Sequence, residues 1–167
     1  KPRFDIPPAA RRSMERVGVL GADEGGLQSR SLARQPAALV RAALAGTTKP
    51  MISRWGHILL RRALASRLAA PEGMNPVEFA TLRARVLNTM GEHVVARALV
   101  QDVDTGNYSP ALTNAAIDAY VGSADIVGTD ILNSLLVDAK DAQVASMPRA
   151  AEQPRCPEFT EMTDCSR

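Results

Sequence analysis

Two histidines are the side chains of this 167-residue sequence best suited to acid–base chemistry. His57 lies between Gly56 and Ile58 without an acidic neighbour, whereas His93 directly follows Glu92. The sequence contains no Gly-x-Ser-x-Gly, P-loop or dinucleotide-binding motif that would supply a catalytic framework. We therefore predict a protein that is not an enzyme. The alternative is a cell-envelope hydrolase with dispersed site residues, which a cleft holding either histidine beside a carboxylate would favour.

The acidic residues do not form a convincing metal site. Residues 102–107 have the acidic spacing of a calcium loop, but Gly106 comes one position early and Thr113 stands where such loops have glutamate. We interpret this segment as a turn between helices in which Asp104 and Asn107 satisfy backbone groups. We predict no metal and no other cofactor.

Cys156 and Cys165 are the only cysteines, and both lie near the end of the chain. A disulfide between them would close a short loop and would persist only in an oxidising compartment. Two reduced thiols in an irregular tail are the alternative. With the disulfide, we predict an exported or periplasmic protein, with association to a membrane surface as an option.

Composition favours an all-α protein. Aromatic residues make up only 4% of the chain, and the hydrophobic 46% is dominated by Ala, Leu and Val, which suits closely packed helices better than a β-sandwich. No apolar run reaches the roughly 18–20 residues that cross a bilayer. Glycine and proline divide the chain into an extended basic arm of residues 1–30, a helical-hairpin domain of residues 31–140 and an irregular tail of residues 141–167.

Proline and glycine also set the expected helix boundaries, because proline is tolerated in a first turn and glycine favours a helix end. The predicted helices span residues 37–45, 50–68, 76–90, 92–101, 110–121 and 124–138. The helix at 76–90 has two apolar faces, with Glu78, Arg83 and Arg85 between them. A helix with two apolar faces packs between neighbours, which favours a stack of hairpins; a four-helix bundle is the alternative.

Residues 84–99 resemble a tetratricopeptide unit, in which a helix, the turn Met-Gly-Glu and a second helix follow one another. A glycine between two helices recurs 31 residues later, where residues 117–123 correspond to residues 86–92. The resemblance implies stacked antiparallel helical hairpins that form a short solenoid-like domain. In overall style the chain is similar to uncharacterised exported helical-repeat proteins of alphaproteobacteria, which implies no activity.

Charge is unevenly distributed along the chain. Residues 1–67 hold 13 Lys or Arg and 4 Asp or Glu, whereas residues 68–167 hold 7 and 14. The basic half suits an acidic surface, either of another protein or of an anionic membrane; pairing between the two halves is the alternative. The few aromatic residues and the lack of a nucleic-acid-binding motif argue against nucleic acid as a partner. The predicted interaction residues are Arg11, Arg12, Arg16, Arg54, Trp55 and Arg61.

The segment of residues 50–68 is amphipathic, and its apolar face has two interpretations. Arg54, His57 and Arg61 form its polar face, and Trp55 stands near one end of the apolar face. Such a stripe usually belongs to a protein core, whereas a helix lying on a membrane surface is the alternative. The other apolar positions are Ile52, Ile58, Leu59 and Ala63.

Together these patterns predict a non-enzymatic scaffold or accessory subunit that docks on other protein subunits through its arms and its helical surface. The proline-rich termini motivate this prediction, because such arms become ordered most readily against a partner. Peripheral binding of residues 1–67 to a membrane remains the alternative beside the hydrolase.

Overall fold

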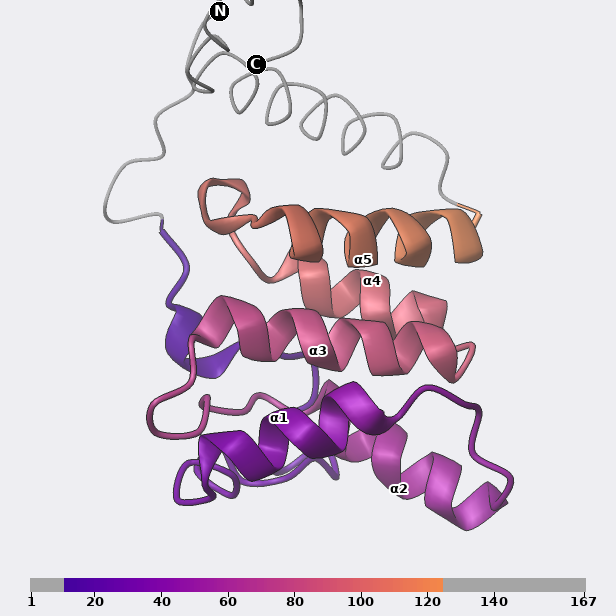
Figure 1. The fold of residues 1–167 in the computed structure, drawn as a ribbon, viewed down its shortest axis with the longest axis horizontal. Helices are drawn as coiled ribbons and strands as arrows, with labels where there is room; N and C mark the ends of the chain where they lie inside the picture. The colour runs from indigo at the N-terminus through magenta and orange to yellow at the C-terminus, as the bar shows by residue number, and fades with distance from the viewer. Residues whose placement is uncertain (1–10, 125–167) are drawn as a thin grey trace, which may run out of the picture.

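The computed structural model describes residues 11–124, which form five α-helices, two short 3-10 turns and no strand (Figure 1). The predicted all-α fold is therefore confirmed. The helices are α1 (Ala37–Gly46), α2 (Arg54–Ala65), α3 (Pro76–Thr89), α4 (His93–Gln101) and α5 (Pro110–Gly122), and the turns are η2 (Met14–Arg16) and η3 (Thr105–Asn107). The predicted helix at 124–138 falls almost entirely outside the described residues, as do the tail of residues 141–167 and its two cysteines.

Local capping signals explain where three of the helices begin. The side chains of Ser53, Asn75 and Ser109 each accept a hydrogen bond from a backbone N–H of the first turn, at 2.8–3.3 Å. Pro76 and Pro110 directly follow two of these caps. Such bonds satisfy donors that a helix leaves unpaired at its start. The cap at Ser53 also explains why α2 begins later than the predicted helix at 50–68, and α2 ends earlier, at Ala65.

α3 is the central helix and packs against each of the other four α-helices. Eight of its fourteen residues are buried, as expected of a helix with two apolar faces. α4 turns back from α3 at Gly91, whose φ is 78°, and α5 packs against both. Leu87, Leu99 and Leu112 from these three helices are completely buried. This α3–α4–α5 unit holds most of the hydrophobic core.

α1 and α2 lie on the side of α3 opposite to α5 (Figure 1). α1 buries only Val40, and α2 buries only Leu64 and Ala65. Each of these helices packs more against α3 than against the other. They therefore form a thinner outer layer, called here the α1–α2 layer.

Arg83 of α3 is fully buried, although its place in the sequence pattern is between the two apolar faces. Its Nε donates to the backbone carbonyl of Leu64 at 2.9 Å, and its Nη1 donates to that of Val17 at 2.8 Å. Its Nη2 donates to the carbonyls of Leu64 and Ser66. Burial lowers the pKa of Arg83 to about 9, while the carboxylate of Asp102 opposes this shift. The charged guanidinium thus satisfies carbonyls that α2 leaves unpaired at its end.

The first described residues pack against the rest of the protein and do not extend away from it. The amides of Val19 and Leu20 donate to the carbonyl of Ala65 at 2.8 and 3.0 Å, and the amide of Arg67 donates to the carbonyl of Leu20 at 2.9 Å. Val17 is 3% exposed and belongs to the core. The prediction of an extended arm over residues 1–30 therefore needs correction for its described part, because these backbone bonds hold it beside the end of α2.

Candidate functional site: an apolar groove between α1 and α2

Large apolar side chains remain exposed on the α1–α2 layer. Ile52 is fully exposed, and Trp55 and Leu59 are 75% and 65% exposed. The interpretation of this stripe as protein core is therefore wrong for these three residues, because α2 turns only its opposite side towards α3 and α4. On α1, Leu39 is 59% exposed. A group of exposed apolar side chains indicates an interaction site, whereas a single one does not.

A groove with a volume of about 320 Å³ runs between α1 and α2. Its lining is apolar apart from Gln35 and Arg83. The volume lies near the lower end of the usual range for ligand pockets, about 300–1,000 Å³. The remaining lining residues are Leu39, Val40, Ala43 and Leu44 of α1, Leu60, Ala63 and Leu64 of α2, Phe79 of α3, and Leu27, Leu32 and Leu68.

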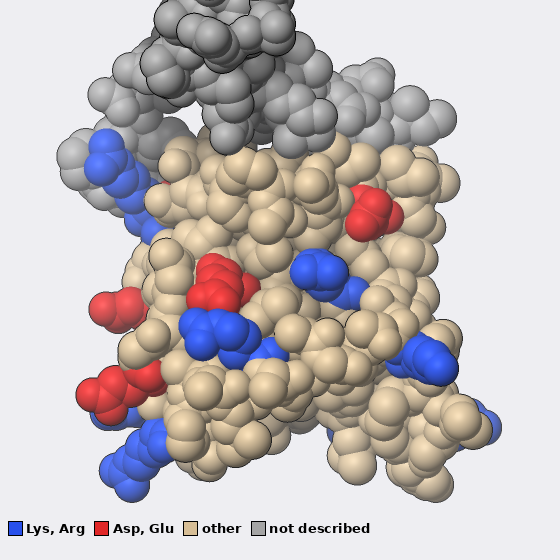
Figure 2. Space-filling view, in the orientation of Figure 1, with Lys and Arg blue, Asp and Glu red and all other residues tan. Residues whose placement is uncertain are grey.

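All charged residues of the segment that builds most of this groove, residues 27–68, are basic. Residues 27–68 contain eight Lys or Arg and no Asp or Glu, whereas residues 69–124 contain three and six. The face shown in Figure 2 carries acidic and basic side chains scattered over uncharged surface, not one basic block. The eight basic residues are Arg30, Arg34, Arg41, Lys49, Arg54, Arg61, Arg62 and Arg67.

Two of these basic residues join the α1–α2 layer to the rest of the molecule. Arg41 of α1 makes a two-pronged contact with Glu78 of α3, with Nε 2.6 Å from Oε1 and Nη2 3.0 Å from Oε2. This hydrogen bonding lowers the pKa of Glu78 and raises the pKa of Arg41. Arg61 of α2 lies 3.5 Å from Glu92 before α4. Both contacts orient helices of the layer.

The structure gives His57 an acidic partner that the sequence does not show. His57 has no acidic neighbour in sequence, but its Nε2 lies 2.7 Å from Oε1 of Glu92, the same oxygen that Arg61 approaches. The separation of 35 residues hid this pair. His93 lies 3.3 Å from Asn88. His57 and Glu92 bridge α2 to the turn before α4, and neither of them lines the groove.

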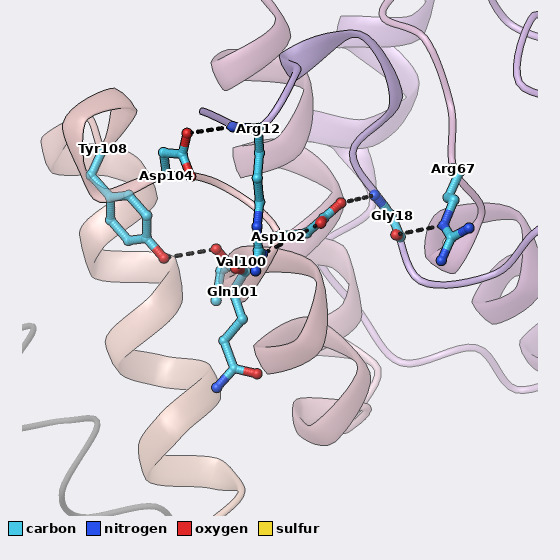
Figure 3. A network of polar contacts seen from close by, with 8 residues as sticks. All are labelled: Arg12, Gly18, Arg67, Val100, Gln101, Asp102, Asp104 and Tyr108. Atoms are coloured by element: carbon cyan, nitrogen blue, oxygen red, sulfur yellow. Dashed lines mark hydrogen bonds and ion pairs between the residues drawn. The ribbon is translucent and has the colours of Figure 1, made fainter. Parts of the chain in front are cut away.

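The predicted interaction residue Arg12 binds acidic and backbone groups of its own chain (Figure 3). Its amide donates to Oδ2 of Asp104 at 2.8 Å, and its Nη1 donates to the carbonyl of Gln101 at 2.7 Å and lies 3.6 Å from Oδ1 of Asp102. The amide of Gly18 donates to the other oxygen of Asp102 at 3.0 Å. Pairing between the basic and acidic halves, the alternative left open by the sequence, thus applies to Arg12.

The same network holds the end of α4. The hydroxyl of Tyr108 donates to the carbonyl of Val100 at 2.8 Å (Figure 3). Burial, with a smaller effect of Tyr120, raises the pKa of Tyr108 to about 12. Together with Arg12, Tyr108 supplies donors to carbonyls in the last turn of α4. Helix capping therefore explains these two contacts of the network.

The six predicted interaction residues do not form one surface. Arg11, Arg12 and Arg16 belong to the segment around η2, whereas Arg54, Trp55 and Arg61 belong to α2, and Figure 1 shows η2 and the start of α2 on opposite sides of the molecule. Arg11, Arg16 and Arg54 are exposed. Only the three residues of α2 lie in the layer that contains the groove.

Comparison with known proteins adds no functional assignment. No protein-family model matches the chain, and neither a curated protein nor a solved structure matches it. The resemblance of residues 84–99 to a tetratricopeptide unit therefore stays a prediction. Within residues 11–124, no three His, Cys, Asp or Glu side chains gather in a way that would hold a metal ion. The described helices include none with the length and apolarity needed to span a membrane.

Proposed function

We propose that this protein is a non-enzymatic accessory subunit that docks on another protein through the α1–α2 layer. The observation that carries the proposal is the apolar groove lined in part by the exposed Leu39, in a layer that also exposes Trp55 and Leu59. Apolar surface of this kind is characteristic of interaction sites, and tryptophan is enriched among residues that dominate binding energy. The helical surface, rather than the arm of residues 1–30, is the docking element in this proposal.

Peripheral membrane binding is the second candidate, and one observation favours it. Trp55 and Ile52 are exposed at the start of α2, beside the exposed Arg54. A tryptophan and an arginine together suit the interface of an anionic bilayer. Sedimentation with anionic vesicles at low and high salt tests this candidate, because the charge contribution weakens as salt rises.

An exported or periplasmic location belongs to the proposal through Cys156 and Cys165. Peptide mass mapping of the native protein without reduction is the test. A linked peptide pair supports the oxidising compartment, and two free thiols after rapid alkylation argue against it.

The docking proposal is tested with two matched variants of the full chain. Leu39→Glu places a charge on the groove, while Val94→Glu places one on α4, where the wild-type side chain is similarly exposed at 63%. The tagged wild type and both variants are purified from the native cells, and co-purifying chains are quantified by mass spectrometry. We expect one stoichiometric chain to be retained by the wild type and Val94→Glu and lost by Leu39→Glu.

Circular dichroism of both variants establishes that they are folded. Equal retention of the same chain by Leu39→Glu and Val94→Glu would place docking elsewhere on the molecule. A wild type that retains no stoichiometric chain, from either the soluble or the membrane fraction, would overturn the proposal.

A further inference from the structure

The groove is a short apolar recess between two helices. Its two helical walls are residues 39–44 of α1 and residues 60–64 of α2, which are about 9 and 7.5 Å long at 1.5 Å per residue. α3 supplies Phe79 and Arg83 to the lining. A recess of this length receives apolar side chains from about two turns of an amphipathic helix, at positions i and i+3 or i+4.

The charge of the surrounding segment specifies the polar side of such a helix. Residues 27–68 contain eight Lys or Arg and no Asp or Glu, and two of these, Arg41 and Arg61, are paired with Glu78 and Glu92. Arg34, Arg54 and Arg62 are among its exposed residues. A ligand with acidic residues beside its apolar face therefore gains attraction from the layer, whereas a basic ligand meets repulsion.

We infer that the groove between α1 and α2 binds an acidic amphipathic helix of the partner protein. This inference rests on the proposed docking function and names the chemistry of the docked segment. A bilayer matches the charge but not the shape, because Val40 and Leu64 on the groove walls are only 8% and 5% exposed. Individual side chains of a helix reach into such a recess, and a flat membrane surface does not.

Trp55 provides a direct reporter for the test. It is the only tryptophan of the chain, it is 75% exposed, and it lies one helical turn before Leu59. Trp55 does not line the groove, so its indole loses water when a bound helix continues from the groove towards the start of α2. Binding is therefore expected to shift the emission of Trp55 to shorter wavelengths, without any added label.

The full-length protein is titrated with three tryptophan-free synthetic peptides of about 12–14 residues, which form three to four turns. The first has leucines at helical spacing and glutamates elsewhere, the second replaces each glutamate by lysine, and the third is a scrambled form of the first without the period. We expect a saturable shift with the first peptide and an affinity at least about tenfold lower for the other two. Leu39→Glu should weaken binding of the first peptide about tenfold, while Val94→Glu should change it less than about twofold.

Four outcomes would overturn the inference. If the lysine peptide bound as tightly as the glutamate peptide, charge would not determine binding. If the scrambled peptide bound as tightly, the helical period would not determine it. A Trp55 shift with anionic vesicles but not with the acidic peptide would identify a membrane surface instead. Loss of the co-purifying chain in Leu39→Glu, together with no binding of the acidic peptide, would leave the docking function standing and refute the acidic helix.

Discussion

The two sides of α3 use apolar side chains in opposite ways. On one side, α4 and α5 bury Leu99 and Leu112 completely. On the other side, α1 leaves Leu39 59% exposed, and α2 leaves Leu59 65% exposed. Since the α3–α4–α5 unit already contains most of the core, the exposed leucines of the α1–α2 layer are not required by the fold. Under the proposed function, one side of α3 stabilises the fold and the other side binds a partner.

The largest effect on this division should come from Arg83, which ties α2 to α3. Replacing it in Arg83→Met leaves the buried carbonyls of Leu64, Val17 and Ser66 without their donor. We expect a loss of about 3–5 kcal/mol in the free energy of unfolding, measured by urea denaturation. Arg85→Met on the same helix is the control, since Arg85 is exposed, and should change stability by less than about 0.5 kcal/mol. Similar losses in both variants would contradict this role for Arg83.

A pair of leucines compares the two sides directly. Leu87→Ala empties a fully buried position of α3, and Leu59→Ala shortens a side chain that is 65% exposed. We expect the first to cost about 2–5 kcal/mol and the second less than about 0.5 kcal/mol in denaturation experiments. A large loss in Leu59→Ala would show that this side chain stabilises the fold and is not reserved for a partner.

A pair of glycines tests the attachment of the first described segment. Gly18 has a φ of 154°, and a Cβ there would lie 2.2 Å from the backbone oxygen of Ser66. Gly18→Ala should therefore destabilise the protein by at least about 1–3 kcal/mol in thermal unfolding. Gly46→Ala, where a Cβ meets nothing within 4 Å, should be neutral or slightly stabilising. Equal melting temperatures for the two variants would refute the close packing of this segment against the end of α2.

The smallest expected effect concerns Tyr108 and depends on pH. Tyr108→Phe removes the hydrogen bond to Val100 and should cost about 1 kcal/mol below pH 10. Because folding raises the pKa of Tyr108 from 10.0 to about 12, its contribution is present below pH 10 and is lost as pH rises towards 12. The stability difference between wild type and variant should therefore shrink over this interval. A constant difference in urea denaturation would show that Tyr108 does not titrate in this way.

Local signals predicted most of the helices, but the site depended on distant contacts. Asn75 with Pro76, and Ser109 with Pro110, mark helix starts through bonds within one turn, so the sequence displays them. The bond of Arg83 to Val17 spans 66 residues, and no local pattern distinguishes a capping arginine from a solvated one.

Prediction from the sequence meets the same limit at the amphipathic stripe of α2. Periodicity shows that one side of a helix is apolar, but it does not show whether a neighbour covers that side. The sequence therefore does not show that Trp55, at one end of this stripe, is 75% exposed. The groove itself arises from two helices and the segment before them, and only their packing on α3 reveals it.

Hydrogen exchange on the full chain, alone and bound to its co-purifying partner, tests the division of the molecule most directly. The account predicts that the partner slows exchange of the backbone amides in α1 and α2, and that α5 keeps its free-state rates. Slower exchange centred on α4 and α5, with α1 and α2 unchanged, would contradict the assignment of the α1–α2 layer as the docking surface.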